Sequence, residues 1–366
     1  MPTSKPVLDW NIIEIRDGVR SGDISAVEVC QASLDRIATY DPIYNAMTAV
    51  FRDEALEQAA AIDRLAQSDR SDRPLLGIPI TIKDVICSRG QITTAASRIL
   101  KGFRPPYDAT VVTRLKQAGA IIIGKTNCDE FAMGSSTEHS AYGPTKNPWD
   151  TERSPGGSSG GAAAAVAAQF APVSIGTDTG GSIRQPAAFC GVVGLKPTYG
   201  RVSRYGLLAF ASSFDQIGPL TNSVEDTALI LQVLAGVDPA DATSVAQPVP
   251  DYSAALKRDI QGTRIGVPRA MFEHADASID KDILRAYDSA LDIFTAAGAE
   301  LVDITLPHAA HAVPTYYLVA PAEASSNLAR YDGVRYGLRA SLDESADTEK
   351  DLAAMYDRTR NSGFGT

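Results

Sequence analysis

Two Gly- and Ser-rich segments hold the residues of this chain that are best suited to nucleophilic chemistry. The first, PGGSSGG at 155–161, leads directly into an alanine run that favours helix. The second, GTDTGGSIR at 176–184, follows a short apolar stretch of strand character. Glycines let the backbone approach a ligand closely, and the hydroxyls of Ser158 and Ser182 can attack an electrophilic carbon once a base removes their proton. We therefore predict a serine nucleophile within 155–182.

Neither segment is specific by itself. Residues 155–161 also fit a flexible linker or a plain helix start, and they lack the GK[ST] ending of a phosphate-binding loop. They match the G-x-S-x-G nucleophile elbow, but that motif needs a buried strand directly before it. The preceding residues 147–155 are polar and contain prolines, so they do not form such a strand. Residues 176–184 likewise fit a simple turn followed by a capped helix.

The second segment also offers a place for negative charge. Consecutive backbone N–H groups at Thr179, Gly180, Gly181 and Ser182 could converge on one point, as the donors of an oxyanion hole do. The two glycines would leave the space beside them open to a substrate. Each donor of this kind typically contributes about 3 kcal/mol of transition-state stabilisation.

A serine nucleophile needs a base, and histidine is the usual one. The chain has four histidines, none in a segment that suggests catalysis: His139, His274, His308 and His311. Lys83 is the alternative, because it is the only charged side chain in the apolar run before Asp84. Two interpretations remain open. Lys83 either leaves the strand into solvent, or it is buried with its pKa lowered from about 10.4 to roughly 7–8, as a base requires.

Composition and charge narrow the class of protein. Hydrophobic residues make up 44% and charged residues 21% of the 366, which is typical of a globular protein. The formal net charge of −10 argues against a protein that grips nucleic acid through its own charge. No stretch approaches the roughly 18 apolar residues of a membrane span, and the first residues lack the apolar part of a signal peptide. We expect a cytoplasmic protein whose scattered cysteines are free thiols: Cys30, Cys87, Cys128 and Cys190.

Helical and strand patterns alternate along the chain, which indicates a layered α/β architecture. The predicted helices are 8–40 with a break near Gly22, 53–66, 109–118, 162–168, 224–236 and 281–298. The predicted strands are 76–86, 120–124, 173–175, 264–267 and 300–304. We expect 133–160 to be largely loop and 238–251 to be a surface excursion.

The sequence resembles the amidase signature family. The family's defining signature runs from PGGSSGG at 155–161 to GGSIRQPA at 180–187, and GIP at 77–79 followed by Lys83 and Asp84 matches its lysine segment. The similarity covers nearly the whole chain. It implies an α/β fold in which a large mixed central sheet is covered by helices.

The same resemblance suggests how the chain is organised. We expect one amidase domain over 1–366, with an N-terminal helical segment at about 1–70 and the signature core at about 71–236. The remainder of the sheet and its helices would occupy 237–366. Relatives continue past Gly365 with an arginine and an aspartate that hold the α-carboxylate and α-amino group of glutamine. The resemblance therefore implies that the chain is either a truncated form or a fragment, in which the C-terminal part of the fold is missing.

The family resemblance assigns a Ser-Ser-Lys triad to this sequence. Ser182 would be the acylated nucleophile, and Ser158, which the family holds in a cis peptide, would relay its proton. Lys83 would be the terminal base. The residues that the family uses for this chemistry are all present in the chain.

The resemblance also assigns the groups that would contact the substrate. Thr179, Gly180 and Gly181 would supply the oxyanion hole. Tyr316 or Tyr317 would line the pocket for glutamine. No residue is assigned to a metal.

Further segments resemble one branch of the family, the glutaminase subunits of heterotrimeric tRNA-dependent amidotransferases (GatCAB): 129–138, 195–206, 212–219 and 323–333. The resemblance implies that the chain hydrolyses glutamine and passes ammonia to a B subunit in a complex with B and C subunits. The partner would use ATP and Mg²⁺ and bind most of the tRNA, whereas this chain would bind no cofactor and no membrane. The complex would amidate Glu-tRNA(Gln), with Asp-tRNA(Asn) as a further candidate substrate. Two alternatives are a stand-alone amidase for small amides and an inactive scaffold subunit.

Overall fold

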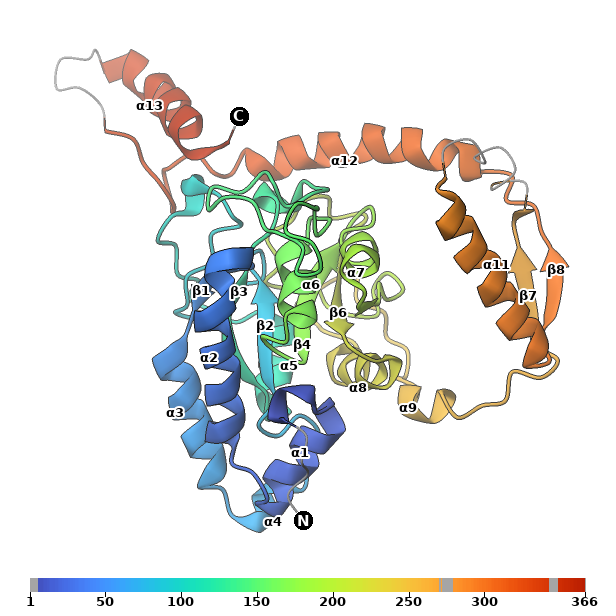
Figure 1. Cartoon of the computed structure of the whole chain (residues 1–366). Coiled ribbons are helices and arrows are strands. Elements are labelled where there is room, and N and C mark those ends of the chain that lie inside the picture. The colour runs from blue at the N-terminus through green and yellow to red at the C-terminus, as the bar shows by residue number, and fades with distance from the viewer. Residues whose placement is uncertain (1–5, 270, 272–278, 342–347, 366) are drawn as a thin grey trace. The chain divides into compact units, whose positions relative to one another are not determined.

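The computed structural model describes residues 6–269, 271, 279–341 and 348–365. The chain divides into two compact units, one formed by Met1–Tyr252 with Ala320–Thr366 and the other by Ser253–Val319 (Figure 1). A single amidase domain over 1–366 stays a prediction. The predicted helical segment and signature core lie in the first unit, whereas the predicted last part, 237–366, is divided between the two.

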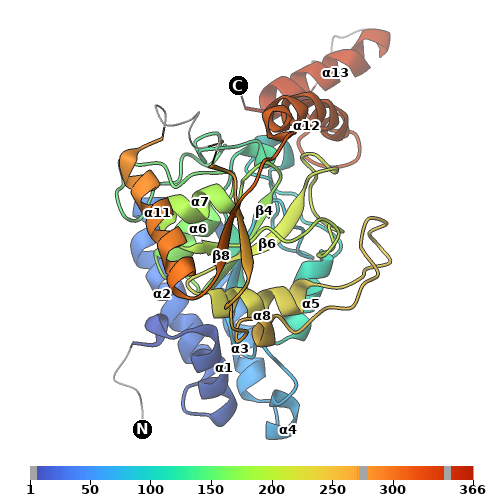
Figure 2. The same ribbon diagram turned by 90° about the vertical axis from the view of Figure 1, so that its right-hand side faces the viewer.

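A six-stranded mixed sheet forms the centre of the first unit (Figure 1, Figure 2). The strand order is β1-β3-β2-β4-β6-β5. The central strand β2 pairs in parallel with β3 and β4, and the remaining pairs are antiparallel. This arrangement confirms the mixed α/β sheet. The strands are β1 (Met47–Val50), β2 (Pro79–Lys83), β3 (Ile121–Thr126), β4 (Val173–Asp178), β5 (Val193–Gly194) and β6 (Gln216–Thr221).

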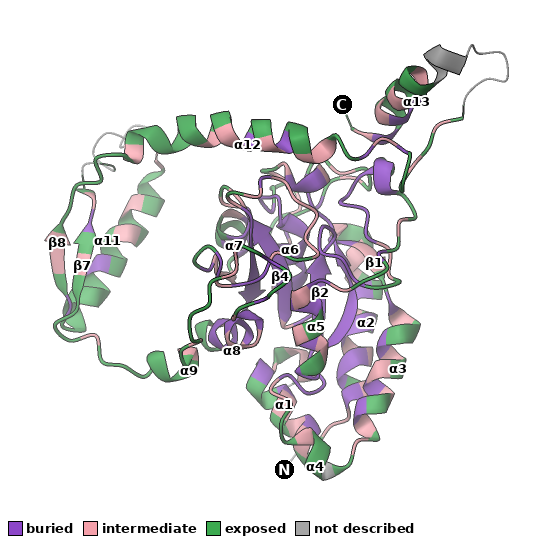
Figure 3. Cartoon of the chain, turned by 180° about the vertical axis from the view of Figure 1, so that it is seen from behind, coloured by how far each residue is buried: buried purple, intermediate pink, exposed green. Residues whose placement is uncertain are grey.

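Helices pack on this sheet and bury its strands. Every residue of β2, β3, β4 and β6 is buried, and the outer faces of the helices are exposed (Figure 3). The helices with residues in this unit are α1 (Ile12–Ser21), α2 (Ala26–Tyr44), α3 (Arg52–Asp63), α4 (Gln67–Arg70), α5 (Thr110–Gln117), α6 (Gly160–Ala167), α7 (Arg184–Cys190), α8 (Val224–Leu234), α12 (Ala312–Leu328) and α13 (Thr348–Gly363). Short 3₁₀ turns lie at Val7–Asp9, Arg98–Leu100 and Glu130–Ala132.

Local sequence signals explain where the first helices begin and end. The Asn11 side chain accepts a hydrogen bond from the N–H of Glu14, whose own side chain accepts from the N–H of Asn11. Ser25 and Glu28 form the same capping box at the start of α2. Gly22 ends α1 with a φ of 86°, a left-handed conformation that suits glycine. The predicted break near Gly22 is confirmed.

The sequence patterns did not reveal all of the elements. The sequence of β6 is QIGPLT, and its glycine and proline are unfavourable in strands, so the pattern does not predict a strand. The structure buries β6 at every position. α12 contains Pro321, and α13 follows a polar stretch. The predicted loop at 133–160 and the excursion at 238–251 are confirmed.

The second unit has its own small sheet. Its strands β7 (Arg264–Val267) and β8 (Glu300–Asp303) are parallel and are joined through α11 (Lys281–Ala296). A short helix α9 (Tyr252–Ala255), a 3₁₀ turn at Ala309–His311 and the first part of α12 also contribute residues to this unit. The predicted strands 264–267 and 300–304 and the predicted helix 281–298 are thus confirmed to within a few residues.

Candidate active site

Lys83, the last residue of β2, is fully buried at the centre of the sheet. Its Nζ lies 2.7 Å from Ser158 Oγ, 3.0 Å from Ser159 Oγ and 2.8 Å from Thr177 Oγ1. Of the two interpretations of Lys83, the solvated strand end is therefore wrong and the buried amine is correct. The sheet itself accounts for the contact, because β4 runs parallel to β2 and carries Thr177 to the same end.

The three hydroxyls differ in what they can exchange with the amine. Ser159 donates its own hydrogen to the backbone carbonyl of Thr177 at 3.0 Å, so it can only accept from Lys83. Within the described residues, Ser158 Oγ and Thr177 Oγ1 contact no polar group other than Lys83 Nζ. A neutral Lys83 has one lone pair, which must accept from Ser158 or from Thr177. The arrangement can therefore take a proton from Ser158.

Burial lowers the pKa of Lys83 to about 8, from the usual value of 10.5. Loss of hydration disfavours the ammonium form and outweighs the opposing effect of Asp129, Asp178 and Asp215, which favour the charge. Lys83 is thus partly neutral near pH 7–8, within the range that suits a general base.

The loop that carries Ser158 is tightly enclosed. The Gly157–Ser158 peptide is cis, as the family resemblance implied. A Cβ added at Gly157 would lie 2.2 Å from Asp129 Oδ2 and 2.7 Å from Ser136 N, so only glycine fits there. Asp129 is held in turn by the N–H groups of Thr137 at 2.9 Å and of His139 at 3.3 Å.

Ser182 lies at the start of the turn that leads into α7, and only 8% of its surface is exposed. Its backbone carbonyl accepts from Ser159 N at 3.1 Å, which brings the two Gly/Ser segments together. Within the described part of the chain, the Ser182 hydroxyl has no hydrogen-bond partner of its own. The structure thus joins Lys83 to Ser158 by a direct hydrogen bond and brings the segment of Ser182 alongside, while the step from Ser158 to Ser182 stays a prediction.

The backbone donors next to Ser182 are not equivalent. Gly181 N donates to Asp178 Oδ1 at 2.8 Å, which occupies one of the three predicted oxyanion donors. Over the residues that the structure describes, the N–H groups of Thr179, Gly180 and Ser182 have no partner. The geometry favours these three over Gly181 as donors to a developing oxyanion.

Asp178 holds this turn in place. Its fully buried carboxylate accepts from Arg184 Nε at 3.0 Å and from Arg184 Nη2 at 2.9 Å, and also from the N–H groups of Gly181 and Ile183. Burial alone would raise the pKa of Asp178, but these hydrogen bonds and the Arg184 charge hold it below its usual value. Asp178 is therefore ionised at neutral pH and fixes the turn through Ser182.

The two tyrosines predicted to line a glutamine pocket both lie on α12. Tyr316 and Tyr317 stack edge to face with ring centroids 5.5 Å apart, and Tyr317 is 68% exposed. Both belong to the second unit. Their contact with substrate stays a prediction.

A second lysine is also fully buried, although no sequence pattern above singled it out. Lys125 lies on β3, is fully buried, and donates to the carbonyl of Ile86. Burial lowers its pKa to about 8, against the opposing charge of Asp84. The signal was the same as for Lys83, a lone charge in an apolar strand, here the run IIIGKT. Among the described residues, Lys125 Nζ makes no hydrogen bond to a hydroxyl or a thiol, so this signal alone does not identify a base.

Metal-ligand clusters, membrane-spanning helices and the cysteines were the remaining features to compare with the sequence. Across the described residues, no three or more His, Cys, Asp or Glu side chains gather as metal ligands would. No helix in the described ranges is long and apolar enough to cross a membrane. All four cysteines are free and buried, and burial raises the pKa of Cys30 to about 12 and that of Cys190 to about 12.

The fold and the Lys83–Ser158 site define the class of protein. The chain belongs to the amidase family, whose family model matches residues 28–366. It is 54% identical to the glutamyl-tRNA(Gln) amidotransferase A subunit of Syntrophobacter fumaroxidans, over 96% of this chain and 70% of that protein. The protein of the same name from Roseiflexus castenholzii is 55% identical over 98% of this chain and 71% of its own length.

Solved structures show the same similarity. The glutamyl-tRNA(Gln) amidotransferase A subunit of Thermotoga maritima matches with a TM-score of 0.77 and 39% identity, over 98% of this chain and 74% of that one. The peptide amidase of Stenotrophomonas maltophilia matches with a TM-score of 0.83 and 36% identity, with the same coverage of 98% and 74%. The chain is an enzyme of the amidase and amidotransferase type, and its fold is that of the amidase signature enzymes.

Proposed function

We propose that the chain is the glutamine-hydrolysing subunit of a tRNA-dependent amidotransferase. The contact between Lys83 Nζ and Ser158 Oγ at 2.7 Å, in the loop that Ser182 adjoins, supports the hydrolytic step. The identity of 54–55% to proteins named as the A subunit of glutamyl-tRNA(Gln) amidotransferase supports glutamine as the amide donor.

The proposed reaction uses the hydroxyls in sequence. Neutral Lys83 takes the proton of Ser158 while Ser158 takes that of Ser182, and Ser182 Oγ attacks the side-chain amide carbon of glutamine. The N–H groups of Thr179, Gly180 and Ser182 stabilise the negative charge that develops on the amide oxygen. The relay returns the proton to the leaving nitrogen, the C–N bond breaks, and ammonia departs. Water then hydrolyses the glutamyl ester on Ser182 and gives glutamate.

We further propose that the ammonia serves a partner. In this proposal the chain works in the cytoplasm in a heterotrimer with B and C subunits, and the B subunit binds tRNA, ATP and Mg²⁺. The net charge of −10 supports this division, because an acidic chain is poorly suited to hold tRNA by itself. The chain itself would need no metal or cofactor, since the proposed hydrolysis uses only its own lysine, serines and backbone N–H groups.

Ammonia release from glutamine tests the proposal directly. The chain, alone and together with purified B and C subunits, is expected to release ammonia from glutamine, and Ser182→Ala should release none. Co-purification with B and C is also expected. Equal turnover of small amides without partners would instead favour a stand-alone amidase. Stable binding to B and C without turnover of any amide would favour an inactive scaffold.

A further inference from the structure

Asp215 lies directly before β6 and is bound to the segment that would hold the oxyanion. The Thr179 hydroxyl donates to Asp215 Oδ1 at 2.6 Å, and Asp215 is only 2% exposed. We propose that Asp215 is a positioning residue for amide hydrolysis, which acts through Thr179 to aim the oxyanion-binding N–H groups. This inference rests on the proposed function, because it presumes that a substrate oxygen binds beside Thr179.

Thr179 needs such an anchor because the sheet does not hold it. β4 ends at Asp178, which pairs with Gln216 as the last register of the β4–β6 ladder. Beyond that pair, within the described residues, neither the N–H nor the carbonyl of Thr179 or Gly180 has a hydrogen-bond partner. The Thr179 hydroxyl is therefore the group that ties Thr179 and Gly180 directly to a neighbouring segment, while Asp178 holds the next residue, Gly181. Donors aimed in advance stabilise an oxyanion better than donors that must reorient.

The Asp215 carboxylate is suited to this role because the groups that contact its oxygens all donate. Oδ1 also accepts from Ala211 N at 3.1 Å, and Oδ2 accepts from Phe210 N at 3.0 Å. Burial raises the pKa of Asp215, and the bonds from Thr179, Ala211 and Phe210 oppose that effect. An ionised carboxylate can accept from all three donors at once, whereas an asparagine side chain has only one acceptor oxygen.

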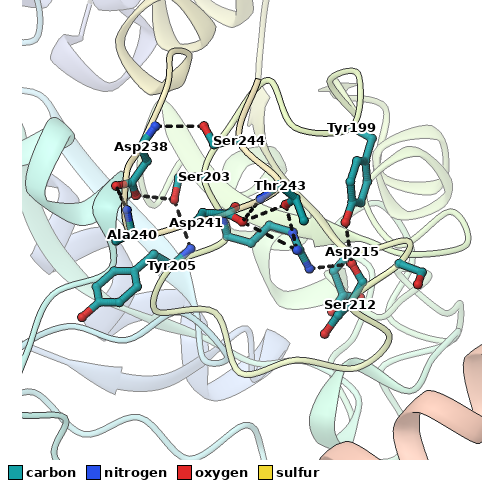
Figure 4. A network of polar contacts seen from close by, with 12 residues as sticks. Tyr199, Ser203, Tyr205, Ser212, Asp215, Asp238, Ala240, Asp241, Thr243 and Ser244 are labelled. Atoms are coloured by element: carbon teal, nitrogen blue, oxygen red, sulfur yellow. Dashed lines mark hydrogen bonds and ion pairs between the residues drawn. The ribbon is translucent and has the colours of Figure 1, made fainter. Parts of the chain in front are cut away.

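The loop that carries Asp215 is itself held from outside. Arg204 Nη1 donates to the carbonyl of Ser212 at 2.5 Å. Tyr199 Oη donates to the same carbonyl at 2.9 Å (Figure 4). Arg204 is oriented by Asp241, whose Oδ2 accepts from Arg204 N at 2.8 Å, and by Thr243 Oγ1, which accepts from Arg204 Nη2 at 2.9 Å. A rigid support of this kind is what a positioning residue requires, since a mobile Asp215 could not fix Thr179.

The opposite side of the loop is anchored by α12. Asn327 Nδ2 donates to the carbonyl of Phe210 at 3.1 Å, and Glu323 accepts from Ser213 N at 3.0 Å. These residues belong to the first unit, as Asp215 does. Asp215 thus belongs to a loop that is fixed on two sides. It contacts the short segment Thr179–Gly180, which lies beyond the end of the β4–β6 ladder.

A pair of substitutions at Thr179 separates its side chain from its backbone. Thr179→Val removes the hydroxyl at nearly constant volume and leaves the N–H in place, whereas Thr179→Ser keeps a hydroxyl that can reach Asp215. We expect kcat for glutamine hydrolysis to fall about tenfold or more in Thr179→Val, since outright loss of one oxyanion donor costs about 10²–10³-fold. KM should stay nearly constant, and Thr179→Ser should retain most of the activity.

Asp215→Asn completes a double-mutant cycle. The kcat of Asp215→Asn should fall by a similar factor. The double variant Thr179→Val with Asp215→Asn should have a kcat no lower than that of the less active single variant, because both substitutions remove the same contact. Asp226→Asn is the matched control. Asp226 is also 2% exposed and also accepts a backbone N–H, that of Ile12, but it lies on α8 away from the site. It should lower the melting temperature without lowering kcat of the folded enzyme.

The rate of labelling by a serine-reactive sulfonyl fluoride gives a second measurement that does not depend on glutamine. If the unmodified chain is labelled at Ser182 but does not hydrolyse glutamine, the proposed function fails while Asp215 is still tested by the labelling rate. Multiplying effects in the double variant would overturn the inference. A Thr179→Val variant with unchanged kcat and labelling rate would also overturn it. So would an Asp215→Asn variant that, like Asp226→Asn, has a lower melting temperature but an unchanged kcat.

Discussion

Replacement of Lys83 by methionine tests the central step of the proposed mechanism. Methionine fills a similar volume in the buried site but can neither accept a proton nor bond to Ser158, Ser159 and Thr177. A positioned general base contributes about 10²–10⁴-fold to a rate, so kcat/KM of Lys83→Met should fall by that factor. The assay is ammonia release from glutamine over pH 6–10, with the folded fraction measured by circular dichroism.

The pKa of Lys83 sets the shape of the pH profile. With a pKa of about 8, about one lysine in ten is neutral at pH 7, half are neutral at pH 8 and about nine in ten at pH 9. Because the neutral form is the base, kcat/KM of the unmodified enzyme should rise about fivefold from pH 7 to 8 and less than twofold from pH 8 to 9. Lys83→Met should lack this rise.

Lys125→Met is the matched control, because Lys125 is equally buried and also has a pKa of about 8. Removing it takes away the positive charge that favours the ionised form of the buried Asp84 carboxyl, so Lys125→Met should lower the free energy of unfolding. Its folded fraction should nevertheless keep the kcat and the pH profile of the unmodified enzyme. A Lys83→Met variant within tenfold of normal activity, or one that retains the rise near pH 8, would refute the assignment of Lys83 as base.

Three other positions give separate tests of the site. After reaction with glutamine and rapid quenching, mass spectrometry should detect no covalent acyl-enzyme in Ser182→Ala. An acyl-enzyme in that variant would show that another residue is the nucleophile. Gly157→Ala should fold poorly or lose activity, because its Cβ would lie 2.2 Å from Asp129 Oδ2; normal melting and turnover would contradict this packing. The lowered pKa of Asp178 stabilises the fold above the carboxyl pKa of the unfolded chain, and this contribution is lost as pH falls through the lower folded value. Arg184→Gln should reduce that contribution, so the loss of stability on acidification below the usual carboxyl pKa should be smaller than in the unmodified chain. Unchanged acid unfolding curves would show that the pair is not coupled to folding.

Much of the fold could be predicted from local patterns. The predicted break near Gly22 separates the two helices α1 and α2, and the apolar runs that end at Lys83 and Thr126 marked two buried strands. β6 could not be predicted, because its burial comes from β4 and β5 on either side and not from its own composition. α12 was missed because a proline inside a helix lowers its local signal, although the helix forms.

The sequence by itself determined which residue types are available for the chemistry. It contains serines in two glycine-rich loops, a lysine in each of two apolar strands, and a family signature that joins the two loops to Lys83. It left open whether Lys83 is solvated, because burial depends on what packs beside the strand end and not on the strand itself.

Only the tertiary structure decided how the Gly/Ser-rich region functions as a site. Parallel pairing of β2 with β4 brings Lys83 against Thr177 and the 155–161 loop, and the surrounding layers remove the water that would keep its pKa near 10.5. The structure also distinguished Lys83 from Lys125, two buried lysines with similar pKa values and different neighbours. The physical reason is the same in both cases: hydrogen bonds and desolvation act over a few ångströms in space, between residues far apart in the chain.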